Sequence, residues 1–172
     1  MVVLNPQPRP ESSISAKSES LNNLSVVTEL VCREQRVLFT GDIEREALTR
    51  LTHSGNSAHI ALLKVPHHGA KSSLERRWLE AIRPAVAVVS AGRGNPYGHP
   101  AGEVLAAYQA VETQIWRTDR DGAIWAELDL TRQQLSMHST REWILQPALT
   151  SADIWSVEQD NLRRLWRRWN WT

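Results

Sequence analysis

The sequence is short of several features, and each shortage excludes something. It has one cysteine, Cys32, among 172 residues, so no disulfide can form within the chain. No apolar run approaches the ~20 residues of a membrane-spanning helix, and no charged-then-apolar leader is present. We therefore expect this chain to carry neither an anchor nor a secretion signal of its own. Basic and acidic residues number 20 and 19, so the net charge of +1 indicates no acidic partner. No histidine precedes His53.

What is present fits one soluble globular unit. The chain is 41% apolar and 23% charged, and its length suits a single domain. Residues 1–21 are rich in proline and serine, which is typical of a loop. A folded unit is expected over 22–140, and a C-terminal extension with a basic, Trp-rich tail over 141–172.

The folded unit alternates apolar strand patterns with helical patterns. Helices are expected at 43–51, 74–82 and 100–108, and strands at 2–4, 24–31, 37–39, 60–65, 85–90, 114–117, 123–130 and 135–140. Ser72 or Ser73 is expected to cap the second helix, and Pro100 to begin the third. The turn signal at 119–122 predicts a hairpin that places Trp116 opposite Trp125. This order predicts an α/β fold with a mixed sheet.

Polar residues with chemical potential follow the central strands. Asp42 ends one strand, His67 and His68 end the next, and His99 lies in the loop after the third. Because ligands gather outside the carboxyl ends of strands in open α/β sheets, we expect these side chains to converge. Such oxygen and nitrogen ligands suit Zn²⁺, Mn²⁺ or Fe, which lower the pKa of bound water towards ~7.

Each residue also has a simpler interpretation. Asp42 follows Thr-Gly and is a candidate cap for the next helix. His67 and His68 are adjacent, so their side chains should point in different directions and ligate one ion unequally. His99 precedes Pro100 and is a candidate for the start of a helix with no ligand role. These alternatives remain open at the level of sequence.

Five segments, in order, carry a resemblance to a known family. The segments read NNLSVV, LFTGDIE, LKVPHHG, YGHP and RTDRDGAI, and they occupy 22–27, 38–44, 63–69, 97–100 and 117–124. This ordered set resembles the metallo-β-lactamase-like domain of ComEC-type competence proteins over about 22–128.

The resemblance implies an αββα sandwich and a metal-dependent phosphodiesterase-like or nuclease-like centre. It also implies a place on the extracytoplasmic face of a bacterial inner-membrane channel that takes up transforming DNA. Asp42 would be a metal-bridging carboxylate and His99 the last imidazole of the site. His67 or His68 would be a ligand or a proton-transfer group, with His67 preferred as the ligand.

One departure from the family limits the expected activity. The upstream His-x-His-x-Asp-His motif and the channel-forming membrane segments are missing, so residues 22–140 resemble only the C-terminal portion of the domain. We therefore expect weak binding of Zn²⁺ or Mn²⁺ and little nuclease activity. The alternatives are another hydrolase of this fold acting on a small phosphodiester or ester, and a non-catalytic module that contacts DNA or a membrane.

The C-terminal tail has a pattern of its own. Residues 161–172 contain four arginines and no acid, and Leu162, Leu165, Trp166 and Trp169 recur at helical spacing. Such a segment can lie on an anionic membrane surface or along a nucleic-acid backbone, and it can also simply pack on the domain. The residues expected at a membrane surface are Arg163, Arg164, Trp166, Arg167, Arg168 and Trp169.

Overall fold

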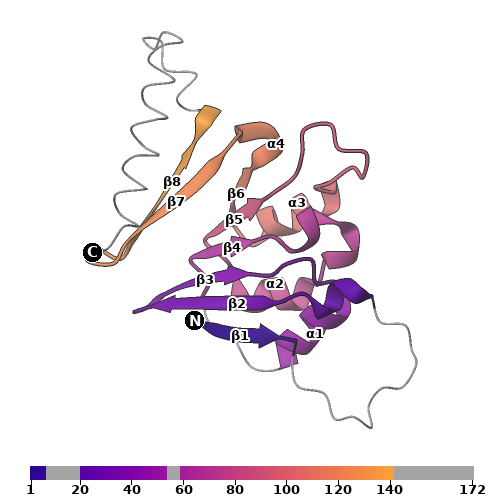
Figure 1. Cartoon of the computed structure of the whole chain (residues 1–172), viewed down its shortest axis with the longest axis horizontal. Helices are drawn as coiled ribbons and strands as arrows, with labels where there is room; N and C mark the ends of the chain where they lie inside the picture. Colours follow the sequence, from indigo (N-terminus) through magenta and orange to yellow (C-terminus); the bar gives the residue numbers. More distant parts are fainter. Residues whose placement is uncertain (7–19, 54–58, 142–172) are drawn as a thin grey trace, which may run out of the picture.

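The computed structural model describes residues 1–6, 20–53 and 59–141. A six-stranded sheet with the order β1-β2-β3-β4-β5-β6 forms its centre, and a separate two-stranded sheet pairs β7 with β8 (Figure 1). The strands are β1 (Val2–Asn5), β2 (Val27–Cys32), β3 (Gln35–Phe39), β4 (Leu62–Lys64), β5 (Val86–Val89), β6 (Gln114–Arg117), β7 (Ile124–Asp129) and β8 (Gln134–Ser139).

The large sheet is mixed, as the sequence predicts. Strands β1 to β3 pair antiparallel, whereas β3 to β6 run parallel to one another. Helices separate the parallel strands in the sequence: α1 (Arg45–His53), α2 (Arg76–Ile82) and α3 (Gly102–Ala110). The short α4 (Thr118–Asp121) follows β6. The predicted α/β class with a mixed sheet is confirmed.

The core lies between the large sheet and helices α1, α2 and α3, which lie on one side of it (Figure 1). Leu38, Leu63 and Ala87 point to this side from three neighbouring strands and are almost fully buried. Leu48 of α1 and Trp78 of α2 pack in the same cluster. Burying such side chains is worth roughly 1.5–3 kcal/mol each, which explains why the apolar runs became the central strands.

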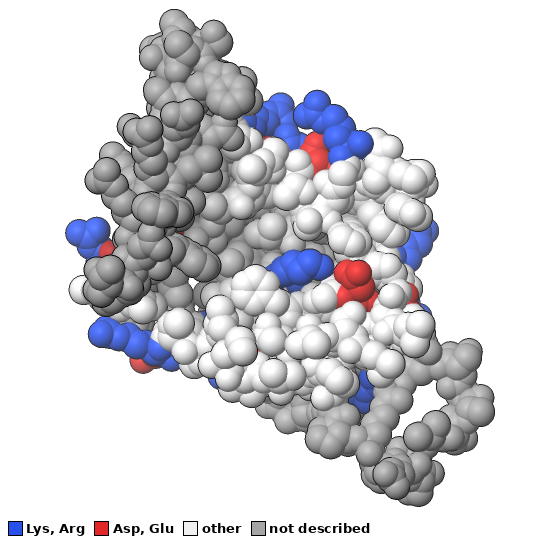
Figure 2. Space-filling view, viewed as in Figure 1, with Lys and Arg blue, Asp and Glu red and all other residues white. Residues whose placement is uncertain are grey.

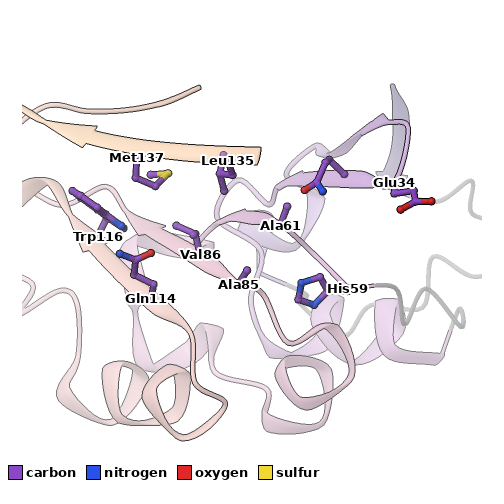
Figure 3. A pocket seen from close by; sticks show the side chains of 10 residues that line it. Glu34, His59, Ala61, Ala85, Val86, Gln114, Trp116, Leu135 and Met137 are labelled. Atoms are coloured by element: carbon purple, nitrogen blue, oxygen red, sulfur yellow. The ribbon is translucent and has the colours of Figure 1, made fainter. Parts of the chain in front are cut away.

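The opposite face of the sheet is also poor in charge. Side chains alternate along a strand, so Phe39, Leu62, Val86 and Val88 point away from the helices. Figure 2 shows few charged side chains in the middle of the face on view. Strand β8 crosses part of this second face, where Met137 lies over Val86 and Trp116 (Figure 3).

The segment after β6 differs from its prediction. Strands β6 and β7 do not form a hairpin, because α4 separates them and β7 pairs with β8 instead. Trp125 therefore stacks on His138 of β8, with ring centroids 5.5 Å apart, and does not pair with Trp116. The segment does turn, but its Asp121 carboxylate accepts a hydrogen bond from the backbone of β6 and its Asp119 carboxylate pairs with the Arg117 side chain.

Two predicted helix starts are also wrong. The Glu75 side chain caps α2 by accepting a hydrogen bond from the Arg77 N–H (3.1 Å), whereas Ser72 and Ser73 lie in a preceding 3-10 helix. Helix α3 begins at Gly102, two residues after Pro100. The first error arises because a 3-10 helix precedes α2, and the second because the chain is still extended at Ala101; neither feature is visible in the apolar spacing.

No helix in the described part of the chain is long and apolar enough to cross a membrane. The predicted membrane-surface residues Arg163, Arg164, Trp166, Arg167, Arg168 and Trp169 lie outside the described residues, as does most of the predicted 1–21 loop.

Candidate functional site

The carboxyl ends of β3, β4 and β5 bring the expected site residues together. Asp42 follows β3, His67 and His68 follow β4, and His99 lies in the loop between β5 and α3. His67 contacts both other rings: its ring centroid lies 6.3 Å from that of His68 and 6.0 Å from that of His99. Asp42, His67, His68 and His99 are called the histidine cluster below.

The backbone of the cluster is left-handed at two consecutive residues. His67 has φ 45° and ψ 47°, and His68 has φ 54° and ψ 18°. This region is unfavourable for residues with a Cβ, and such conformations occur preferentially at functional sites. The turn fixes the directions of both imidazoles, so local strain accompanies their placement.

Gly69 brings the third imidazole close. Its φ is +79°, and a Cβ at this position would lie only 2.7 Å from the Pro100 Cβ. The Gly69 carbonyl accepts a hydrogen bond from the Ala101 N–H (2.9 Å). The PHHG and GHP segments therefore depend on each other, because only glycine allows the two loops to approach.

The two adjacent histidines point in different directions, as the sequence predicts, and each faces its own carboxylate. His67 Nδ1 lies 3.3 Å from Glu44 Oε1, and His68 Nε2 lies 3.8 Å from Asp42 Oδ1. His68 Nδ1 is also 2.6 Å from the Ser90 carbonyl oxygen at the end of β5. When His68 donates this hydrogen bond from Nδ1–H to the Ser90 carbonyl, Nε2 carries the free lone pair, on the side of Asp42.

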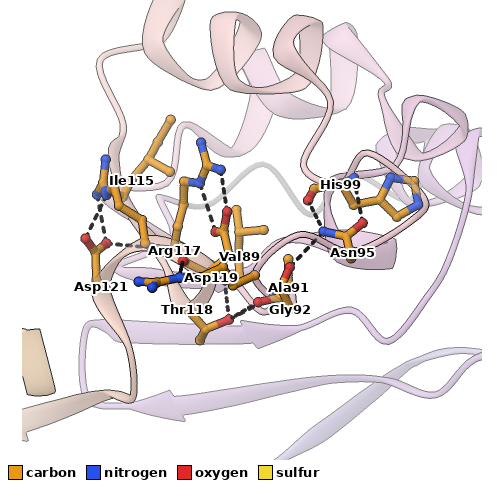
Figure 4. Close-up of polar contacts among 12 residues, drawn as sticks. Val89, Ala91, Gly92, Asn95, His99, Ile115, Arg117, Thr118, Asp119 and Asp121 are labelled. Carbon is orange, nitrogen blue, oxygen red and sulfur yellow. Dashed lines mark hydrogen bonds and ion pairs between the residues drawn. The ribbon is translucent and has the colours of Figure 1, made fainter.

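Asn95 holds His99 in position from both sides of its backbone. Asn95 Nδ2 donates to the His99 carbonyl (2.6 Å), and the His99 N–H donates to Asn95 Oδ1 (3.0 Å) (Figure 4). Burial lowers the pKa of His99, and the neighbouring His67 and His68 lower it further. His99 is therefore biased towards the neutral imidazole, which is the form that binds metals.

Glu44 and Lys64 belong to the surroundings of the cluster and were not singled out from the sequence. Burial raises the pKa of Glu44, but hydrogen bonds from Ser20, Ser72 and Asn22 outweigh it, and the pKa is lowered overall. Glu44 therefore stays ionised beside His67. Its position two residues after Asp42, on the same turn, is the one signal that could have found it.

Lys64 supplies a cation next to Asp42. Its Nζ donates to the Gly41 carbonyl (3.0 Å) and lies 3.7 Å from Asp42 Oδ1. Burial lowers the pKa of Lys64, and Asp42 opposes that shift. The lysine therefore ties the TGD turn to β4 and partly balances its carboxylate.

The simpler interpretations of Asp42 and His99 do not describe the geometry. The side chain that accepts from the Glu44 N–H at the start of α1 is Asn23 Oδ1 (2.7 Å), not Asp42. The residue preceding α3 is Ala101, which makes no side-chain cap, so His99 is not the cap of that helix.

As a metal site, the cluster has the right kind of donors but too few in place. Among residues 1–6, 20–53 and 59–141, the buried Nδ1 atoms of His67 and His99 make no hydrogen bond, although His67 Nδ1 lies 3.3 Å from Glu44 Oε1. His99 Nδ1 is therefore the nitrogen that is available to a ligand. In the same residues, however, no three side chains of His, Cys, Asp or Glu stand so that they could hold one ion.

The segment from Arg117 to Gly122 has a structural role. Asp121 Oδ2 accepts from the Arg117 N–H (2.9 Å), and Arg120 Nη2 donates to the Ile115 carbonyl (3.2 Å) (Figure 4). These bonds give partners to the Arg117 N–H and the Ile115 carbonyl on the outer edge of β6. Arg117 and Asp119 form a bidentate pair with distances of 3.0 and 2.6 Å. We call this segment the 117–122 turn.

Two hollows lie away from the cluster. One of about 360 Å³ lies at the amino ends of β4, β5 and β6, where His59, Ala61 and Gln114 face Leu135 of β8 (Figure 3). A second, of about 250 Å³, lies along β6 beside the 117–122 turn. Neither is lined by a residue of the histidine cluster.

The chain is similar to proteins of known name over about three fifths of its length. It is 33% identical over 105 residues to ComE operon protein 3 of Bacillus subtilis (strain 168), covering 61% of this chain and 14% of that protein. It is 32% identical over 104 residues to Competence protein ComA of Neisseria gonorrhoeae, covering 60% and 15%. It is 30% identical over 105 residues to Recombination protein 2 of Haemophilus influenzae, covering 61% and 13%.

These similarities support a relationship to ComEC-type competence proteins, so the coarser part of the predicted resemblance is confirmed. The chain spans only about a seventh of the length of these relatives. No protein-family model matches it. No solved structure matches it either, and the metallo-β-lactamase assignment stays a prediction.

Proposed function

We propose that this chain takes part in the uptake of transforming DNA, as part of a larger membrane protein on the extracytoplasmic face of the bacterial inner membrane. DNA and the channel part of that protein are its proposed partners. The similarity to a protein named Competence protein ComA supports this role. Residues 22–140 would form the later portion of a metallo-β-lactamase-like domain.

The histidine cluster is the proposed centre. One observation carries the proposal: Asp42, His67, His68 and His99 lie together at three neighbouring strand ends, and within the described residues the buried His99 Nδ1 has no partner. Histidines that serve packing alone would be expected to have satisfied nitrogens. The remaining groups of a phosphodiesterase centre would come from elsewhere in the protein.

The chain's own residues would bind and orient a phosphodiester. Lys64 provides a fixed cation at the cluster, and its carbonyl contacts hold it in place. His68, aligned by Ser90, is positioned to move a proton at Nε2. A divalent cation, when bound, would polarise a phosphoryl oxygen. Asp42, His67 and His99 are its proposed ligands, and we expect weak binding because three donors do not meet at one point.

Titration of the purified chain with Mn²⁺ or Zn²⁺, followed by calorimetry, tests this proposal. We expect weak binding that falls at least about tenfold in Asp42→Asn and in His99→Ala. His138→Ala removes a histidine of β8, outside the cluster, and should leave binding unchanged. Equal binding by all variants would overturn the metal assignment.

A nuclease assay of the metal-loaded chain tests whether the centre is incomplete. We expect little degradation of DNA. Degradation at the rate of an enzyme, abolished by Asp42→Ala, would contradict the proposal that groups outside this chain are required.

A further inference from the structure

An exposed aromatic ring borders the histidine cluster. Tyr97 is 78% exposed. One face of its ring stacks on His99, with ring centroids 5.9 Å apart and an interplanar angle of 23°. Since His99 also contacts His67, the tyrosine ring is linked to the cluster through His99. The stack leaves the other face of the phenol ring open.

The loop that carries Tyr97 is held in one shape by its own hydrogen bonds. Asn95 accepts through its carbonyl from the Gly98 N–H (3.4 Å), and its side chain bonds the Gly92 and His99 carbonyls at 2.9 and 2.6 Å. Gly94 and Gly98 adopt the positive φ values that this path requires, 65° and 67°. A ring on such a loop is presented to solvent with little freedom to lose when a ligand stacks on it.

We propose that Tyr97 is a stacking platform for an unpaired base of single-stranded DNA whose phosphate lies at the histidine cluster. This inference rests on the proposed function and names the form of DNA that the site takes. The flat, open ring face matches a base, and stacking of this kind tolerates any sequence because every base has a π-face.

Two basic side chains could contact a phosphate backbone, one at the cluster beside the carboxylate of Asp42 and one on the loop that carries Tyr97. Lys64 lies at the cluster beside Asp42, and Arg93 is exposed on the same loop as Tyr97, with its Nε near the Asp119 carbonyl (3.4 Å). A duplex would not use the ring, because its bases already stack on each other and are enclosed by two backbones. A single strand therefore gains a base contact that a duplex does not.

Binding of two oligonucleotides in the absence of added metal tests the inference. One is oligothymidine, and the other is an abasic deoxyribose-phosphate chain of equal length. The full chain should bind oligothymidine about tenfold more tightly, since stacking on one aromatic ring contributes a factor of this order. Tyr97→Ala should remove the preference, and Tyr97→Phe should retain it. Trp125→Ala is the matched control, because Trp125 also stacks on a histidine but lies on β7.

Ultraviolet crosslinking of iodouracil-substituted DNA provides a second readout that does not depend on affinity. We expect the crosslinked peptide to contain Tyr97. Equal binding of both oligonucleotides by the unaltered chain, or crosslinks only at other sites, would overturn the stacking role while leaving phosphate binding intact. Absence of binding to either oligonucleotide would overturn it too, whereas the proposed metal site is judged separately by the Mn²⁺ titration.

Discussion

The histidine cluster and the 117–122 turn are both rich in charged and polar side chains, yet they are built in opposite ways. In the turn, Arg120 pairs with Asp121 at 2.7 Å, and Asp121 also accepts from the backbone of β6. In the cluster, the buried Nδ1 of His99 has no partner among the described residues, His67 Nδ1 lies 3.3 Å from Glu44 without a hydrogen bond, and His68 lies 3.8 Å from the nearest carboxylate oxygen of Asp42. The polar groups of the turn are bonded to one another and to the backbone, whereas the cluster keeps hydrogen-bonding capacity that a ligand can use.

This difference separates two kinds of sequence motif. A motif whose polar groups satisfy one another and the backbone contributes to stability, because breaking it leaves buried groups unpaired. A motif whose groups are held in place but left unpaired is available to a ligand. Both motifs carry the resemblance to competence proteins, but only the histidine cluster has the second property.

The largest effect is expected in the turn. Asp121→Ala removes the carboxylate that accepts from the Arg117 N–H and pairs with Arg120. Charge-assisted bonds contribute about 1.5–3 kcal/mol each, so we expect the free energy of unfolding to fall by about 3 kcal/mol. Urea denaturation followed by circular dichroism measures it. Binding of Mn²⁺ to the variant, measured under conditions in which it is still folded, should be unchanged. A loss of binding would show that the turn and the histidine cluster are not functionally separate.

A smaller effect, of opposite sign, is expected in the cluster. His67→Gly relieves a left-handed backbone, which a residue with a Cβ adopts at a penalty of roughly 1–2 kcal/mol. We expect the free energy of unfolding to rise by about 1 kcal/mol while metal binding weakens.

The matched control for that variant is His53→Gly. It also exchanges an imidazole for hydrogen, but at the helical end of α1, and it should destabilise the fold by up to about 1 kcal/mol. If both variants lose stability equally, the left-handed backbone at His67 does not lower the free energy of unfolding. The cluster would then not differ from the turn in this respect.

The smallest expected effect is on pH dependence. Bonding to Arg120 lowers the pKa of Asp121, and bonding to Arg117 lowers that of Asp119, both from an ordinary 3.8. The unfolded chain then binds protons before the folded chain does, so this stability is present above pH 3.8 and is lost as pH falls through the lowered values. Unfolding free energies measured between about pH 5 and pH 2 should fall less steeply in Asp121→Asn than in the unaltered chain. Identical slopes would show that the turn is not electrostatically stabilised.

The alternation of strands and helices could be predicted because it follows from the spacing of apolar residues along the sequence. Runs such as 60–65 and 85–90 are apolar except near their carboxyl ends, and such runs are stable as strands that are buried on both faces. The convergence of Asp42, His67 and His99 followed from the rule that parallel strands end at one edge. These parts depend on repeated, local patterns.

What could not be predicted depends on single long-range contacts. The 117–122 turn has the composition of a hairpin turn, and only the position of β6 at the sheet edge recruits its side chains to the backbone. The side chain that accepts from the Glu44 N–H at the start of α1 is that of Asn23, twenty-one residues earlier in the chain, and local spacing pointed instead to Asp42 as the cap. Glu44 acquires its importance from His67, which no spacing rule connects to it.

The bonds from Arg120 and Asp121 to the backbone of β6 also have a consequence for assembly. They occupy the outward-facing carbonyl of Ile115 and N–H of Arg117, the groups that an additional strand would need. Within the described residues, no strand pairs with the far side of β1, where Val2 and Val3 are about half exposed. The two edges of the large sheet therefore differ. The edge at β6 is blocked against pairing with a further strand, so a β-strand from another polypeptide would have to join at β1.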